Sequence, residues 1–356
     1  MDAPKESDSF LFIGQSAQQA CEIQQYFEMR KLLGGEKRNV FSPVIVQPGC
    51  AIPQSEENTE DAIDMNELSA KRDEYAPYSI AYFKSLKTTQ SLLLEHEGPV
   101  KNMVCLTEVQ TIGRGRNKRS WFSPYGGLTF SIKIPVNQTL LEFIPHLCVL
   151  AVVLAIDETV PHEGSPVCIH WPYDVYAMET KVCGILCEVC HDMDDASAVV
   201  GIGINVNNTN QPCLRAVLGK KERIARTPLL LSFLVHLKRI LSAFWQERQQ
   251  VLLLYYQRWR HFGQTIHCVD LHNTTRTMTI CGLSENANIC CRSQSGTLYE
   301  LYPDPNCVDS VENMIAHPVD MATCSVDTLS SPNDVLSSPY DAVPYSLDTM
   351  SPIDRL

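Results

Sequence analysis

The chain has 356 residues, and 44% of them are hydrophobic, which is enough to build cores of ordinary size. Its formal net charge of -12 argues against generic binding of nucleic acid along a whole face of the protein. The 15 cysteines are scattered without the spacing of a metal site, and the start MDAPKESDSF lacks the basic and apolar regions of a secretory signal. We therefore expect a reduced intracellular protein with free thiols and no protein-bound metal.

Membrane insertion is not expected from the longest unbroken apolar run, residues 147–156. A helix needs roughly 20 predominantly apolar residues to cross a bilayer, and this run is far shorter. The run therefore predicts a buried helix in a protein that does not bind membranes.

Residues 1–75 form an N-terminal segment of mixed character that we expect to be partly disordered. Residues 9–33 could hold a short strand and a helix. Residues 54–67, QSEENTEDAIDMNE, are acidic and poor in large apolar side chains, which predicts a flexible linker.

Residues 76–262 carry the densest apolar patterning and predict the main α/β domain. Short alternating segments bounded by glycine predict strands, and long runs with apolar residues at helical spacing predict helices. Thr227 is the expected N-cap of the last helical region, with Pro228 at its first position. The expected strands cover residues 102–110, 126–136, 181–190 and 197–208, and the expected helices cover residues 139–158 and 226–259.

Residues 263–317 change to short strands separated by turns, which predicts a small all-β module. Its four expected strands cover residues 264–271, 275–283, 288–293 and 297–303.

Residues 318–356 change in composition again. Asp327, Asp334, Asp341 and Asp348 recur every seven residues, but prolines inside each unit forbid a continuous helix. We expect a disordered acidic Ser/Pro tail, with Pro-directed phosphorylation as the regulatory alternative.

The stretch QTIGRGRNKRSW, residues 110–121, gathers four cations around two glycines in an acidic chain. Gly113 and Gly115 would let the backbone approach an anion, and Arg114 and Arg116 supply bidentate donors. A solvated basic loop is the plainer alternative, because the pattern completes neither a dinucleotide fingerprint nor a phosphate-binding loop. An aromatic residue and a Gly-Gly strand follow at once, which favours a cationic flap beside a sheet edge.

Two further motifs could serve the same site. Lys181 stands just before a buried strand with Gly184, where it could neutralise a carboxylate or phosphate or form an ordinary surface ion pair. Gly201 and Gly203 indicate close approach of a ligand or backbone to a strand, or only tight strand packing. Asn205 and Asn207 would then point to one face.

These motifs resemble a known family. The patterns GRGR....WFSP.GGL, WP.D.Y....K.CGIL.E and GIGINV, in that order, resemble the catalytic domain of biotin protein ligases. YYQRWRHFGQTI and YELYPDPNCVDSVENMI resemble the end of the central domain and the C-terminal β-module of eukaryotic holocarboxylase synthetases, so the similarity covers residues 76–317. It implies an α/β fold with a class II aminoacyl-tRNA-synthetase-like mixed, largely antiparallel sheet flanked by helices, followed by a small SH3-like β-barrel.

The resemblance also implies a reaction. The carboxylate of biotin attacks the α-phosphate of ATP, with Mg²⁺, to give biotinyl-5'-AMP and pyrophosphate. The ε-amine of a lysine in the biotin-acceptor domain of a carboxylase then takes the biotin. Joining two anions requires cations and donors aimed at the phosphoryl group, and a flap that excludes water. The expected location is the cytoplasm, with mitochondria as a further compartment.

The resemblance assigns roles to matched positions of this chain. Arg116 and Lys181 would be catalytic, with Arg116 steadying the α-phosphate and Lys181 stabilising developing charge. The implied biotin-binding residues are Gln110, Gly113, Arg114, Arg116, Lys181, Gly184 and Gly201, and the implied ATP-binding residues are Arg116, Trp121, Asp174 and Asn205.

Several positions depart from the family pattern. His170 and Tyr173 replace a lysine and an asparagine of the nucleotide region, and Lys118 stands where the flap often has glycine. Pro305 replaces a glycine of the C-terminal module. Residues 75–88 resemble the helix that precedes the first strand, so that strand is expected to be missing near Lys87, and the biotin-contacting turn is reduced to Thr88-Thr89-Gln90.

Three alternatives stay open. A catalytically weak or inactive homologue could bind carboxylase partners without turnover, as the departures suggest. A repressor-ligase would need an N-terminal winged helix, and residues 1–75 show no basic helix-turn-helix pattern. Lipoate ligation is a related enzyme activity that the Gly-Arg-Gly-Arg flap disfavours.

Overall fold

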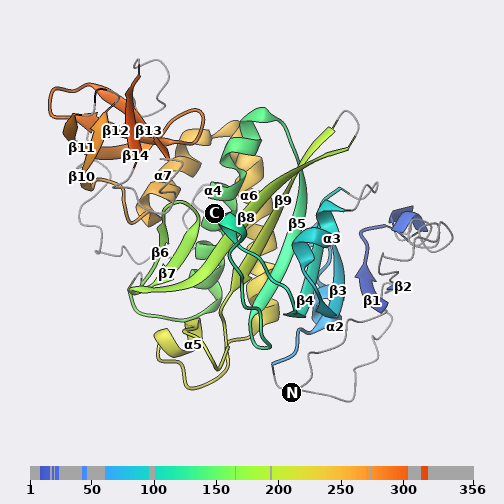
Figure 1. Ribbon diagram of the computed structural model, residues 1–356. Helices are drawn as coiled ribbons and strands as arrows, with labels where there is room; N and C mark the ends of the chain where they lie inside the picture. Colours follow the sequence, from blue (N-terminus) through green and yellow to red (C-terminus); the bar gives the residue numbers. More distant parts are fainter. Residues whose placement is uncertain are drawn as a thin grey trace, which may run out of the picture.

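The structure is a computed structural model of the full chain, shown in Figure 1. It describes residues 9–16, 18–19, 21–23, 42–45, 61–95, 101–164, 166–192, 195–270, 272, 274–303 and 314–319. The predicted acidic tail beyond residue 319 and Pro305 lie outside these residues.

A nine-stranded sheet runs through the middle of the molecule in the order β2-β1-β3-β4-β5-β9-β8-β7-β6 (Figure 1). The pairs β1–β2 and β3–β4 are parallel, and the other pairs are antiparallel. The prediction of a mixed, largely antiparallel sheet is therefore confirmed. Its strands are β1 (Ser9–Ile13), β2 (Ser42–Ile45), β3 (Ser79–Leu86), β4 (Met103–Gln110), β5 (Leu128–Val136), β6 (Val167–His170), β7 (Asp174–Ala177), β8 (Thr180–Asp192) and β9 (Asp195–Ile204).

Strand β3 corrects the prediction of a missing strand near Lys87. Ser79–Leu86 lies between β1 and β4 and is paired with both, so the expected helix over residues 75–88 is wrong. Both faces of β3 carry buried side chains, including Ile80 on one face and Phe83 on the other. A strand buried on both faces loses its alternation of apolar and polar residues, so its period could not distinguish it from a helix.

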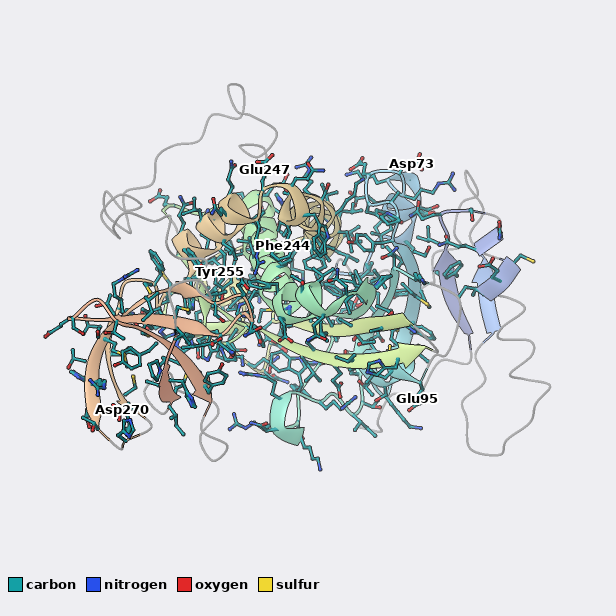
Figure 2. All side chains as sticks on the ribbon, turned by 90° about the horizontal axis from the view of Figure 1, so that it is seen from above. Asp73, Glu95, Phe244, Glu247, Tyr255 and Asp270 are labelled. Carbon is teal, nitrogen blue, oxygen red and sulfur yellow. The ribbon has the colours of Figure 1, made fainter. Side chains whose placement is uncertain are left out.

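The two faces of the sheet are covered differently. Helices α4 (Gln138–Thr159), α6 (Arg226–Gln246) and α7 (Arg248–Arg258) pack on one face, as expected, where the ring centroids of Phe130 and Phe233 lie 5.1 Å apart. The short helix α3 (Thr89–Leu94) lies on the other face. Figure 2 shows this arrangement edge on, with Phe244 and Glu95 on opposite sides of the sheet. Helix α6 begins at Arg226 with Ala225 as its N-cap, so the prediction of Thr227 as the N-cap is wrong.

Helices α4 and α6 are long and apolar enough to cross a bilayer by length and composition alone. In the structure, 83% and 61% of their most apolar windows are buried inside the protein. The packing of both helices against the sheet is therefore the ordinary burial of core helices.

Residues 61–70 belong to the core, although the sequence predicted a linker over residues 54–67. Asp64 caps helix α2 (Met65–Ala70) by accepting from the backbone N–H groups of Asn66 and Glu67. Leu68 is fully buried in the main core, and Asp61 is buried against Arg226. The linker prediction is wrong for residues 61–67, because the acidic side chains there cap a helix and pair with cations.

The C-terminal β-module is a closed barrel at one end of the molecule (Figure 1). The four predicted strands correspond to β10 (Thr265–Asp270), β11 (Thr275–Leu283), β12 (Ile289–Ser293) and β13 (Leu298–Pro303). Strand β14 (Met314–Pro318), which the sequence did not predict, closes the barrel by pairing with β13 and β10. Cys105, Cys148 and Cys183 carry free thiols, as predicted, whereas Cys290 is disulfide-bonded, so the prediction of free thiols is wrong at that position.

Candidate functional site

A cavity of about 490 Å³, including its open mouth, lies on the α3 side of the sheet. Its floor is made of two cross-strand rows of mostly small residues. One row runs Thr129–Gly203–Gly184–Asp174 across β5, β9, β8 and β7, and the next runs Ser131–Gly201–Leu186 across β5, β9 and β8.

Gly203 and Gly201 leave room on this floor for two large side chains. A Cβ atom at Gly203 would lie 2.4 Å from Nε1 of Trp121, and one at Gly201 would lie 2.6 Å from Oε1 of Gln90. Both distances are too short for any side chain at these positions. The close approach predicted from the two glycines is therefore made by the indole of Trp121 and the amide of Gln90.

Residues 111–127, which we call the flap, connect β4 to β5 and fold back over the cavity. The flap has its own backbone hydrogen bonds, from Gly115 N to Arg119 O at 2.7 Å and from Trp121 N to Gly113 O at 2.8 Å. Lys118 has a φ of 58°, in the left-handed region that favours glycine. The resemblance places a glycine at this position, and a lysine there costs about 1 kcal/mol in backbone strain.

Two cations meet one carboxylate at the end of the floor formed by β7 and β8. Lys181 Nζ lies 2.6 Å from Asp174 Oδ2, and Arg116 Nη2 of the flap lies 3.6 Å from the same oxygen. Lys181 Nζ is also 5.9 Å from the ring centroid of Trp121. Both cations lie at this end of the cavity, where they could donate to a bound anion.

The opposite end of the cavity is polar and uncharged. The backbone N–H of Thr89 donates to Gln110 Oε1 at 2.8 Å, and Gln110 Nε2 donates to Ser123 Oγ at 2.9 Å. The hydroxyls of Thr89 and Ser131 are 2.8 Å apart, and Ser131 donates to Gln90 Oε1 at 3.0 Å. This end can offer donors and acceptors to a neutral polar group.

Most of the implied site residues line this one cavity. They are Gln110, Arg114, Arg116, Trp121, Asp174, Lys181, Gly184 and Gly201. Gly113 lies behind the cavity wall, where a Cβ atom would be 2.2 Å from the carbonyl oxygen of Trp121.

Asn205 is not among the lining residues. Its Oδ1 accepts hydrogen bonds from Asn208 and, at 2.6 Å, from Gln211. Strand β9 ends at Ile204, so the alternation that places Gly201 and Gly203 on the floor does not extend to Asn205. Asn207 is buried and donates to Asp61 and to the carbonyl of Ile224.

His170 and Tyr173, the two residues near Asp174 that depart from the family pattern, do not line the cavity either. The ring of His170 packs against the rings of Tyr176 and His261, at centroid distances of 4.8 and 4.4 Å. Tyr173 packs edge-on against the buried ring of His146, and burial raises the pKa of Tyr173 to about 12. Both side chains therefore serve packing against the helices and the start of the barrel.

The sequence interpreted Thr88, Thr89 and Gln90 only as a reduced biotin-contacting turn, and it did not identify Ser131. All four residues line the cavity. Glu188 lies next to it, bonded to both Arg114 and Gln90. Two features of the sequence could have identified lining residues: the polar tripeptide Thr88-Thr89-Gln90, and Ser131 inside the apolar run of β5.

Cys183 precedes Gly184 but is fully buried, and burial raises the pKa of its thiol, which makes it a poor nucleophile. Within the described part of the chain, no group of three or more His, Cys, Asp or Glu side chains could hold a metal ion.

Known proteins are similar to this chain in sequence. The profile of the Biotin/lipoate A/B protein ligase family matches residues 81–205. Biotin–protein ligase 2 of Arabidopsis thaliana is 30% identical over 226 residues, which are 60% of this chain and 68% of that protein. The chloroplastic biotin–protein ligase 1 of the same plant is 31% identical over 226 residues, 60% of this chain and 61% of that protein. The human biotin–protein ligase is 27% identical over 229 residues, 60% of this chain and 31% of that protein.

Solved structures agree in fold. The biotin protein ligase of Aquifex aeolicus in complex with biotin and ATP is 27% identical, with a TM-score of 0.51, and the match covers 67% of this chain and 99% of that one. A mutant of the same enzyme in complex with biotin is 25% identical, with a TM-score of 0.52 and coverage of 67% and 98%. The chain therefore belongs to the biotin protein ligase family.

Proposed function

We propose that this protein is an ATP-dependent biotin–protein ligase. The observation that carries the proposal is a single cavity with a neutral polar end at Thr89 and Gln110 and a cationic end at Arg116 and Lys181. Biotin has a neutral ureido ring and a carboxylate at the end of its aliphatic chain. Its two ends match the two ends of the cavity.

The first half-reaction would join biotin to AMP at the cationic end. A carboxylate oxygen of biotin attacks the α-phosphorus of ATP, a new O–P bond forms, and the bond to pyrophosphate breaks. Lys181 and Arg116 would donate to the oxygens on which charge develops, and Asp174 would hold the ammonium of Lys181 in place. The flap would cover the mixed anhydride and exclude water until the acceptor arrives.

The second half-reaction would use a lysine of an acceptor protein. Its neutral ε-amine attacks the acyl carbon of biotinyl-5'-AMP, the bond from that carbon to the phosphate oxygen breaks, and AMP leaves. The nitrogen loses a proton, and an amide results. We propose biotin-acceptor domains of carboxylases as partners, as the membership of the family implies.

Mg²⁺ fits this reaction as a companion of ATP. The described residues offer no cluster that could hold a resident metal, and the carboxylate of Asp174 is already shared by Lys181 and Arg116. Mg²⁺ often binds mainly through substrate phosphates and water. We therefore propose that it enters with the triphosphate, and no step is assigned to a protein-bound ion.

Two observations favour an active ligase over an inactive binding homologue. Strand β3 and the following Thr88–Gln90 turn are present at the cavity, and His170 and Tyr173 do not line it. Pyrophosphate release from ATP that depends on added biotin tests the proposal. Release that instead requires lipoate, or that is absent in folded protein still binding a carboxylase domain, would overturn it.

A further inference from the structure

We infer that Glu188 is a positioning residue that latches the flap over the cavity. It makes no contact with the Lys181–Asp174 end. It lies on β8 and faces the flap from the floor side of the sheet. Its role would be to hold the first arginine of the Gly-Arg-Gly-Arg motif and to tie it to the polar end of the cavity.

The latch is a two-point ion pair between a loop and a strand. Arg114 Nη1 donates to Glu188 Oε1 at 2.9 Å, and Arg114 Nη2 lies 2.9 Å from Glu188 Oε2. This pairing of both guanidinium nitrogens with both carboxylate oxygens fixes direction as well as distance. The side chains are 38% and 30% exposed, so the pair can open without burying a bare charge.

Gln90 connects the latch to the cavity. Its Nε2 donates to Glu188 Oε2 at 3.0 Å and to the carbonyl of Val199 at 2.9 Å. Its Oε1 accepts from Ser131 at 3.0 Å, so the orientation of the amide is fixed from both sides. The carboxylate of Glu188 and the carbonyl of Val199 can only accept, so together they determine which way the Gln90 amide points.

The polar groups beside the latch are connected by hydrogen bonds. The Ser131 hydroxyl donates to Gln90 Oε1 at 3.0 Å, and the Thr89 hydroxyl lies 2.8 Å from that of Ser131 and donates to Gln110 Oε1 at 3.1 Å. Thr89, Ser131, Gln90 and Glu188 thus form a connected series that ends at Arg114 of the flap. A polar ligand group that bonds to Thr89 or Ser131 would reinforce this series and hold the flap closed.

Hydrogen exchange of the flap backbone in ligand-free protein tests the latch without using activity. We expect residues 111–124 to exchange about three to ten times faster in Glu188→Ala and in Arg114→Ala, as loss of a partly exposed ion pair and one hydrogen bond predicts. The double variant should exchange no faster than Glu188→Ala, because that single variant already removes the ion pair that Arg114→Ala removes. Glu179→Ala is the matched control, since it removes a two-point Arg260–Glu179 pair on the surface.

Unchanged flap exchange in Glu188→Ala, or equal acceleration throughout β8 and β9, would overturn the latch.

A second experiment, which rests on the proposed function, measures the release of preformed biotinyl-5'-AMP from the protein. Glu188→Ala should speed release about three- to tenfold while changing the dissociation constant of biotin less. Absent ligase activity would leave the exchange result standing, so the two proposals fail separately. Glu188→Asp, which keeps the charge, should restore part of the protection, and a lack of any recovery relative to Glu188→Ala would contradict the ion pair as the cause.

Discussion

Lys181 and Asp174 lie on adjacent strands, and the 2.6 Å ion pair between Nζ and Oδ2 holds the lysine at the cationic end of the cavity. Arg116 Nη2 approaches the same carboxylate oxygen at 3.6 Å, so two cations share this carboxylate at one place in the cavity. The pair is therefore a preorganised arrangement in which the donors are already placed before the substrates bind.

Lys181→Met should lower the rate of biotinyl-5'-AMP formation by at least about 100-fold, the usual loss for one preorganised donor in a transition state. Biotin binding, measured by calorimetry, should weaken far less. Lys71→Met is a suitable control, because it removes an exposed lysine that pairs with Glu67 on helix α2. A rate within a few fold of the wild type would remove Lys181 from its assigned role.

Gly203→Ala should displace Trp121 and loosen the flap. The new methyl group would stand 2.4 Å from the indole nitrogen, a distance that no packing can accept, so the indole must move. We expect weaker binding of the adenylate, together with a change in tryptophan fluorescence. Trp121→Ala combined with Gly203→Ala should lose no more affinity than Trp121→Ala alone. Additive losses in the double variant would show that Gly203 acts by another route.

The sequence predicted those parts of the fold and site that depend on local pattern. The two strands that carry Gly184 and Gly201 were predicted as residues 181–190 and 197–208, because both segments are short and apolar. Strand β3 was misinterpreted because it is buried on both faces, and β14 was missed because its pairing with β10 is long-range. Asn205 was placed at the site by the resemblance, but it does not line the cavity, and its side chain bonds Asn208 and Gln211 beyond the end of β9. Glu188 could not be identified, because its partner Arg114 is 74 residues away.

The stability of the fold should decrease in acid because of His146. This side chain is fully buried on α4, its Nδ1 lies 2.9 Å from the hydroxyl of Tyr255, and burial lowers the pKa of His146 to about 3. Since the unfolded chain has a histidine pKa of about 6.5, it binds a proton that the folded protein does not. The contribution is complete above about pH 6.5 and decreases by at most about 1.4 kcal/mol per pH unit as the pH falls toward 3.

Urea unfolding at several pH values measures this slope. His146→Gln should unfold with a flatter dependence on pH in this window, although the variant is less stable overall. His267→Gln changes an exposed histidine of the barrel and should leave the slope as it is. Equal slopes in the wild type and His146→Gln would mean that other groups govern the acid dependence.

Asp61 should be essential for stability even though it precedes the segment that matches the family. Its carboxylate accepts from Arg226 at 3.2 Å, from Arg223 at 2.7 Å and from Asn207 at 2.8 Å. The side chains of Asp61 and Arg226 are 4% and 1% exposed, so Asp61→Ala would leave a buried guanidinium with Glu108 as its remaining acidic partner. Loss of one partner of a buried ion pair costs about 3–5 kcal/mol, and the free energy of unfolding should fall by that amount.

Arg223→Ala provides the matched comparison for Asp61, because Arg223 bonds the same carboxylate from a side chain that is 45% exposed. Its loss should cost no more than about 1 kcal/mol, as for other exposed pairs. Arg226 also donates to the carbonyl of Gly127 at 2.7 Å, at the base of the flap, so Asp61→Ala should speed flap exchange and Arg223→Ala should not. Equal losses of stability in the two variants would show that burial does not determine how much each bond to Asp61 contributes. Normal flap exchange in Asp61→Ala would show that the bonds around Asp61 do not hold the flap in place.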